Sequence, residues 1–188
     1  MTTLVGDPTR FLTLDELGRR LEALGPSPTD VGRVALIVRR PREGFREVLD
    51  RVHLIPGEGV PGDRWSLKPY LDPTTQIAAM ESSVAELIAN GQSLSLFGDN
   101  LLLSIDLSVR NVPAGSRLRA GSAILEVTPT AHTPCAKFRA RFGADAVRFV
   151  SDPAHAHRRL RGVYLRAVEP GEIRTGDAVE VMSRPDSG

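Results

Sequence analysis

The sequence of 188 residues contains a single cysteine, Cys135. One cysteine excludes an intrachain disulfide and a zinc site built from several cysteines. No apolar run approaches the ~18 residues that a membrane-spanning helix needs, so we expect no such span. The N-terminus, Met1 to Phe11, lacks a charged segment followed by an apolar one. We therefore expect no signal peptide and a cytoplasmic protein.

Net charge is nearly absent too: 24 basic and 23 acidic residues leave a formal charge of +1. This balance excludes a nucleic-acid binder driven by bulk positive charge and a disordered acidic protein. Only two of the basic residues are lysines, Lys68 and Lys137, and the rest are arginines. A GC-rich genome is the simplest reason for this bias, although arginine also suits a bidentate grip on phosphate and carboxylate.

Several motifs of common enzyme classes are missing. The chain has no Walker A or Gly-x-Ser-x-Gly pattern, so nucleoside-triphosphate and serine-hydrolase functions are not favoured. Its length and its 41% hydrophobic content favour one soluble domain whose core needs no disulfide or metal.

The N-terminal part predicts a short amphipathic helix. Thr13 and Glu16 fit a capping box, and a Gly-Pro pair ends the helix. Its apolar face consists of leucines at helical spacing: Leu14, Leu17, Leu21 and Leu24. We therefore predict an N-terminal helical extension over residues 1–30, a main domain over 31–183 and a tail over 184–188.

The main domain is predicted to be mainly β. Apolar runs predict strands at 34–38, 52–55, 76–80 and 101–105, a hairpin over 117–128, and a final strand pair, 163–168 with 178–182. Helices are predicted after Ser83 as the N-cap, over 136–150, and from an Asp152-Pro153 start. Many short strands with Gly/Pro turns favour a β-barrel or sandwich with flanking helices, and the lack of long β-α alternation argues against a doubly wound sheet.

Cys135 has the most informative local context. It follows a strand and Pro134 and precedes a helix, and thiolates are stabilised at helix N-termini and near cations. The alternative is a buried, inert cysteine. His132 lies three residues earlier, where it could act with Cys135 as a metal ligand or as a base beside a nucleophile, or be a structural histidine.

Two turn-rich loops carry polar residues. The loop from Gly59 to Trp65 contains Asp63 and Arg64, which either face a ligand or form a surface ion pair. The segment from Phe97 to Asn100 contains Asp99, which with Asn100 either points at a heterocycle or sits in an ordinary tight turn.

A third polar segment is an arginine run. It could bind phosphate or single-stranded nucleic acid, or be a solvated helix end. It consists of Arg158, Arg159 and Arg161. With near-zero net charge and nine aromatic residues (six Phe, two Tyr and one Trp), no nucleic-acid partner is expected.

Taken together and in order, these segments resemble the MOSC family, named for the C-terminal domain of molybdenum-cofactor sulfurase. The resemblance covers roughly residues 31–183. It is carried by Gly59–Arg64, Gln76-Ile77 leading to Glu81, Phe97–Leu101, Gly115–Gly121, Ile124–Thr128, Pro134–Lys137, Arg161–Val168 and Gly171–Asp177.

The resemblance implies a MOSC-type, mostly antiparallel β-barrel with flanking helices. It also implies a protein that handles the molybdenum cofactor (molybdopterin) or activated sulfur, with Cys135 as molybdenum ligand or persulfide carrier; a soft thiolate suits both. Arg64, Asp99, Asn100 and Lys137 match motif positions and are expected to be cofactor-binding pocket residues.

Two departures from the family pattern leave the exact ligand open. Trp65 stands where His is frequent, and Asp99 replaces a Glu. The chain has no iron–sulfur, flavin or PLP-dependent module, so a separate electron donor or cysteine desulfurase is expected as partner, together with a small-molecule substrate. Three functions remain open: reduction of N-hydroxylated substrates, sulfur transfer for metal–sulfur cluster assembly, and non-catalytic binding of a small ligand.

Overall fold

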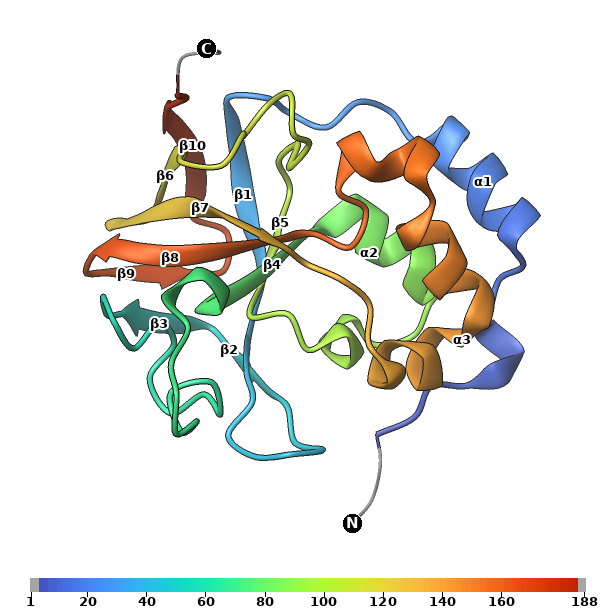
Figure 1. The fold of residues 1–188 in the computed structure, drawn as a ribbon, viewed down its shortest axis with the longest axis horizontal. Coiled ribbons are helices and arrows are strands. Elements are labelled where there is room, and N and C mark those ends of the chain that lie inside the picture. Colours follow the sequence, from blue (N-terminus) through green and yellow to red (C-terminus); the bar gives the residue numbers. More distant parts are fainter. Residues whose placement is uncertain (1–3, 186–188) are drawn as a thin grey trace.

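A closed β-barrel forms one side of the molecule in the computed structural model, which describes residues 4–185 (Figure 1). Seven strands run in the order β10-β6-β7-β8-β4-β5-β1, and β10 pairs back with β1. They are β1 (Val31–Arg39), β4 (Ile77–Glu81), β5 (Leu101–Leu103), β6 (Arg117–Ala120), β7 (Ala123–Ala131), β8 (Val163–Glu169) and β10 (Ala178–Ser183). All neighbours are antiparallel except β4 and β5, so the predicted MOSC-type barrel is confirmed, with one parallel pair.

Three further strands lie outside the closed ring. β2 (Glu47–Leu49) pairs with β1 and extends the sheet, and β3 (Arg51–Leu54) forms a two-stranded sheet with β9 (Gly171–Arg174). The barrel interior is filled by aliphatic side chains from strands that are apolar on the inward face, such as Val34, Leu125 and Leu165. The apolar runs seen in the sequence thus form a continuous core.

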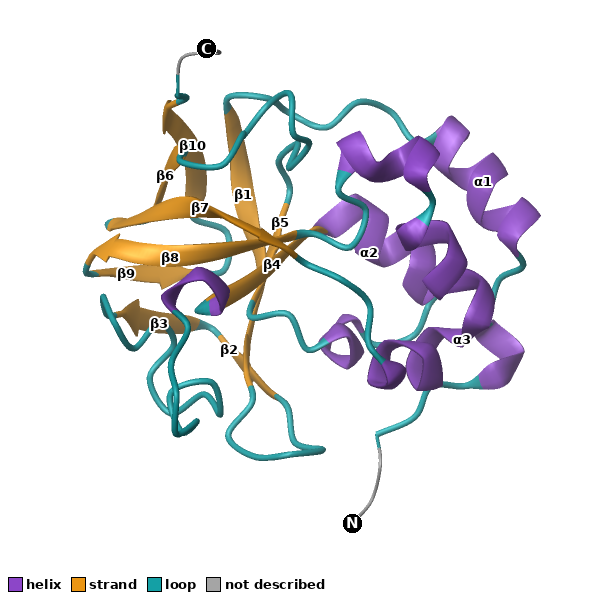
Figure 2. Cartoon of the chain, in the orientation of Figure 1, coloured by secondary structure: helices purple, strands orange, loops and turns teal. Residues whose placement is uncertain are grey.

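The helices gather on one side of the barrel (Figure 2). They are α1 (Leu14–Ala23), α2 (Ser82–Ala89) and α3 (Ala136–Ser151). They share a second apolar cluster with the outer face of β4 and β5; its members include Leu17, Leu21, Met80, Phe138, Phe142 and Phe149. Among the described residues, no helix is both long and apolar enough to cross a membrane.

The predicted capping box of α1 is confirmed. Thr13 Oγ1 accepts a hydrogen bond from the Glu16 N–H (3.3 Å), and Glu16 Oε2 accepts one from the Thr13 N–H (2.9 Å). α1 packs against α2 and α3. The domain boundary at residue 30 stays a prediction, and the last part of the predicted tail, 186–188, lies outside the described residues.

Two local predictions were wrong. Ser83 is not the N-cap of α2: β4 runs directly into the helix, Glu81 occupies the cap position, and Ser83 Oγ donates to Glu81 Oε1 (2.7 Å). The last two predicted strands do not pair with each other. β9 separates them, β8 pairs with β4 and β7, and β10 pairs with β1 and β6, because closing the barrel brings the final strand back to the first.

Gly162 fixes how β8 begins. Its φ is +95°, a conformation that favours glycine, and a Cβ at this position would overlap the carbonyl oxygen of Ala79 on the neighbouring β4. A side chain here would push β4 away from the start of β8, next to Arg161.

We therefore predict that Gly162→Ala destabilises the protein more than Gly176→Ala. Gly176 has nearly the same φ, +94°, but open space where a Cβ would stand, so both variants carry similar backbone strain. Only Gly162→Ala adds steric overlap, which costs about 1–3 kcal/mol. Urea unfolding of both variants measures the difference, and equal midpoints would show that the close approach to Ala79 is unimportant.

Candidate active site

A cavity of about 550 Å³ opens between the barrel, the β1–β2 loop and the start of α3. Cys135 lies at its edge, in extended conformation at the N-cap of α3, and its side chain is exposed. Of the four residues predicted to bind a cofactor, three line the same cavity: Arg64, Asp99 and Lys137. Their roles stay predictions, but the fold places them around one thiol.

Asn100 lies behind the cavity wall and is fully buried. Its Nδ2 donates to Asp63 (3.1 Å) and to the Val38 carbonyl (3.2 Å), and its Oδ1 accepts from Arg40 (3.0 Å) and from the Ala78 N–H (3.2 Å). Asn100 therefore supports the site and does not line the cavity.

Asp63 holds this support together. It is 2% exposed and accepts hydrogen bonds from the Arg40 guanidinium (2.7 and 2.9 Å) and from the backbone N–H groups of Arg40 (2.8 Å) and Trp65 (2.9 Å). Burial raises the pKa of Asp63, but the hydrogen bonds and charge of Arg40 outweigh it, and the net pKa is lowered. The alternative of a surface ion pair between Asp63 and Arg64 is therefore wrong. The partner of Asp63 is Arg40, at the end of β1, which donates from both its guanidinium and its backbone N–H.

Asp99, Arg161 and His132 form a second polar group. Arg161 Nη1 donates to both carboxylate oxygens of Asp99 (2.8 and 3.0 Å). The His132 side chain is 6% exposed, its ring lies against Tyr164 (4.3 Å between centroids), and its Nδ1 is 3.5 Å from Asp99 Oδ1. Burial lowers the pKa of His132 to about 4; the charge of Asp99 opposes this and that of Arg161 adds to it. His132 is therefore neutral at pH 7.

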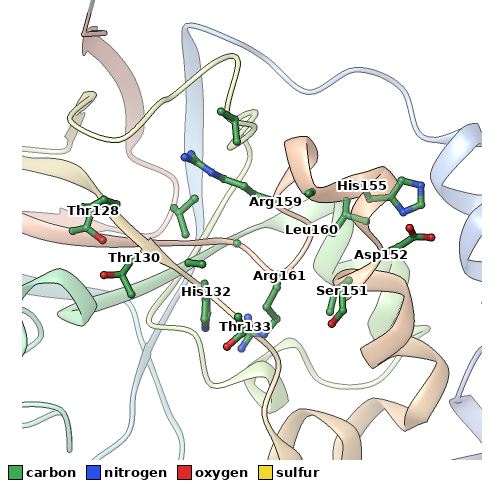
Figure 3. Close-up of a pocket in the computed structure, with 17 residues that line it drawn as sticks. Thr128, Thr130, His132, Thr133, Ser151, Asp152, His155, Arg159, Leu160 and Arg161 are labelled. Atoms are coloured by element: carbon green, nitrogen blue, oxygen red, sulfur yellow. The ribbon is translucent and has the colours of Figure 1, made fainter.

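A smaller cavity of about 320 Å³ shares His132, Thr133 and Arg161 with the first and extends to the end of α3 (Figure 3). In Figure 3 the side chains of His132 and Arg161 point the same way, whereas Arg159 points away from them. Arg159 donates to the Val112 carbonyl (2.7 Å). Arg159 and Arg161 therefore form neither a solvated helix end nor a free site for phosphate or nucleic acid, because their guanidinium groups donate hydrogen bonds inside the protein.

Seven cationic side chains line the cavity that contains Cys135: Arg40, Arg46, Arg64, Lys68, Lys137, Arg141 and Arg161. Three of them pair with carboxylates, namely Arg40 with Asp63, Lys137 with Glu43 and Arg161 with Asp99. Within residues 4–185 the other four have no carboxylate partner. The cavity thus carries excess positive charge and favours an anionic ligand.

Sequence reasoning missed four of these cations as site residues: Arg40, Arg46, Lys68 and Arg141. The available signal for the first two was the cluster of arginines that directly follows the buried strand β1. Arg141 gave no signal, because it stands between Phe138 and Phe142 on the apolar face of a helix.

Fold and site together define a small closed β-barrel protein with one accessible thiol in a cation-lined cavity. The MOSC domain model matches residues 72–180, which is more than half of the chain. The chain therefore belongs to the MOSC domain family.

A curated relative, the uncharacterized protein YflK of Bacillus subtilis (strain 168), is 29% identical over 104 residues, covering 55% of this chain and 44% of that protein. The chain thus spans less than half the length of this relative.

Solved structures agree on the fold. YuaD from Bacillus subtilis matches with a TM-score of 0.61 at 18% identity, covering 80% of this chain and 95% of that one. YiiM from Geobacillus stearothermophilus gives 0.58 at 17% identity (83% and 77% covered), and YiiM from Escherichia coli gives 0.55 at 21% (81% and 70%). At these identities the likeness establishes the fold alone.

We predict that Asp63→Asn destabilises the protein by about 3 kcal/mol, because it leaves the half-buried Arg40 guanidinium without its counter-charge. Glu47→Gln is the matched control: Glu47 pairs with Arg39 at the surface, where such pairs contribute about 0–1 kcal/mol. Chemical denaturation measures both. The Asp63 contribution is present above the unfolded-state pKa and is lost as pH falls through the lower folded-state pKa, so the two proteins should converge in stability in strong acid.

We also predict that His132 does not titrate between pH 5.5 and 8. Proton NMR of the imidazole signals, assigned with His132→Gln, measures this, and the exposed His53 provides an internal comparison. Since the folded pKa lies below the unfolded value, the unfolded chain takes up the proton first, and this residue lowers stability as pH falls from about 6.5 towards 4. A midpoint near 6.5 for His132 would contradict its burial beside Arg161.

Proposed function

We propose that this protein binds the molybdenum cofactor in the Cys135 cavity, with Cys135 Sγ as the protein's ligand to molybdenum, and reduces N-hydroxylated substrates with electrons from a separate donor protein. The observation that carries the proposal is an accessible thiol in a cavity of about 550 Å³ lined by seven cationic side chains.

The donor set fits a metal that arrives with ligands of its own. Among residues 4–185, no cluster of three or more His, Cys, Asp or Glu side chains could hold a bare ion. Cys135 offers one soft donor and would hold a metal that arrives bound to an organic dithiolene. When bound, that group supplies the electron transfer to the substrate.

The cationic residues fit the organic part of the same group. Cationic side chains bind phosphate through charge-assisted hydrogen bonds. Lys68 lines the Cys135 cavity and makes no hydrogen bond through its side chain within the described residues, so it is available to a phosphate of the cofactor. Trp65 in the same loop is buried, and its Nε1 donates to Thr75 Oγ1 (3.2 Å), which fixes the ring in the wall.

His132 is suited to orienting a substrate. As a neutral imidazole it carries one proton, and the nearby carboxylate of Asp99 favours that proton on Nδ1, which leaves Nε2 as an acceptor. Asp99 in turn is fixed by Arg161. In this arrangement His132 accepts a hydrogen bond at Nε2 from a polar hydrogen of the substrate.

Persulfide carriage by Cys135 is the second candidate. The observation that favours it is the exposure of the thiol at the cavity edge, where a desulfurase protein can reach it. The surrounding cations would stabilise the anion of a bound persulfide.

We predict that protein expressed in a host that makes the molybdenum cofactor contains molybdenum, and that Cys135→Ala does not. Thr133→Ala is the matched control, because Thr133 lines the same cavity two residues away and offers no soft ligand. Elemental analysis together with intact mass measures the outcome.

Metal-free wild type that gains the mass of one sulfur atom after exposure to a desulfurase and cysteine, reversibly and only with Cys135 present, would favour the carrier. Metal-free protein without an adduct would refute both candidates and leave a non-catalytic binding barrel.

A further inference from the structure

On the side of the β1–β2 loop, a cavity of about 690 Å³ adjoins the one that contains Cys135. We call it the second cavity; it is distinct from the smaller cavity of Figure 3. It lies between the β1–β2 loop, residues 4–5 and the start of α3. Four residues line both cavities and form their common wall: Arg46, Arg64, Lys137 and Arg141. A molecule bound at this wall can therefore extend into both spaces.

Three guanidinium groups on the common wall lack a carboxylate partner within the described part of the chain. Lys137 is paired with Glu43. Arg141 is 5% exposed, and its guanidinium donates only to backbone carbonyls, for example that of Leu96 (3.0 Å). The Arg64 side chain has no hydrogen-bond partner among residues 4–185.

Arg46 shows the effect of having several unpaired positive charges close together. Its guanidinium lies against Gly98, where a Cβ would stand 2.8 Å from Nη2, and its Nε is buried without a hydrogen-bond partner among residues 4–185. Burial, together with the charges of Arg141, Arg40 and Arg64, lowers the pKa of Arg46 to about 10, and the charge of Asp63 opposes this shift. The group remains charged at pH 7, so an anion at the wall would relieve the repulsion.

The second cavity also has an apolar side. Val5 is 60% exposed and Phe45 is 49% exposed, and both line the cavity. One face of the Phe45 ring is covered by the guanidinium of Arg42, 3.5 Å from the ring centroid. Burying the remaining apolar surface against a ligand is favourable.

We propose that the two cavities together bind an amphipathic organic anion, a carboxylate or phosphate monoester whose charged group sits at Arg46, Arg64 and Arg141 and whose apolar part lies against Val5 and Phe45. This rests on the proposed function, since it names the substrate class of that site. A small inorganic anion would use only the charged wall, and a neutral apolar molecule only the apolar side.

Binding to the metal-free full-length chain tests the proposal. The probes are octanoate and octyl phosphate, compared with acetate, inorganic phosphate and the neutral octanamide. Trp65 is the single tryptophan and lines the Cys135 cavity, so its fluorescence reports binding there, and calorimetry measures affinity independently. We expect at least one octyl anion to bind on the order of tenfold tighter than both octanamide and its own short or inorganic counterpart.

Two pairs of variants separate the two halves of the site. Arg64→Gln should weaken binding of the octyl anion about tenfold, whereas Arg119→Gln, which changes an exposed arginine on β6, should not. Phe45→Ser should weaken the octyl anion but not inorganic phosphate, whereas Met182→Ser, at a residue of similar exposure (46%) on β10, should change neither. Unchanged thermal midpoints would show that the variants are folded.

The proposal is overturned if octanamide binds as tightly as both octyl anions, if acetate and inorganic phosphate match them, or if Arg64→Gln has no larger effect than Arg119→Gln. Because the measurement uses metal-free protein, its result is separate from the molybdenum analysis. Binding without molybdenum incorporation would refute the proposed function alone, and molybdenum incorporation without such binding would refute this substrate class alone.

Discussion

The buried carboxylate of Asp63 is the contact on which the geometry of the site depends. It joins three parts of the chain: Arg40 at the end of β1, Trp65 in the following loop, and Asn100 at the start of β5. Each partner donates to it from a different segment, so the loop cannot move without leaving a buried charge unsatisfied. The wall that carries Arg64 and Trp65 is positioned by this one side chain.

A cavity with so many cations needs a structural reason to persist. Asp63 behind the wall and Asp99 in the wall each neutralise one arginine, and the Arg141 guanidinium donates to carbonyl oxygens. Carbonyls accept hydrogen bonds without cancelling the charge. The fold thus holds the Nε and Nη1 donors of Arg141 while its positive charge stays available to a ligand, which is the condition for an anion site ready before binding.

The features that the sequence revealed are those encoded over a few residues. The apolar runs predicted the strands, Thr13 and Glu16 predicted the cap of α1, and the position of Cys135 between a strand and a helix marked the thiol. Apart from the N-cap of α2, where the strand runs directly into the helix, the errors concern partners far apart in sequence. Asp63 pairs with Arg40, 23 residues away, and β10 pairs with β1 at the other end of the domain. Local patterns carry no information about such pairs, because pairing is decided by barrel closure.

The site combines two parts of the chain that differ in how closely they follow the family. Cys135, Asp99, His132 and Arg161 lie within the segment matched by the MOSC model. The β1–β2 loop and the loop with Arg64 and Trp65 precede residue 72 and lie outside it. The matched segment supplies the thiol and the neutral imidazole, which are the groups that suit chemistry. The preceding loops supply most of the cations and the apolar wall, which are the groups that suit recognition. The two parts are joined by Asp63, which lies in the preceding loop and accepts hydrogen bonds from Arg40 and from Asn100 of the matched segment. The recognition groups are therefore held in register with the thiol by a contact that reaches across the boundary of the matched segment.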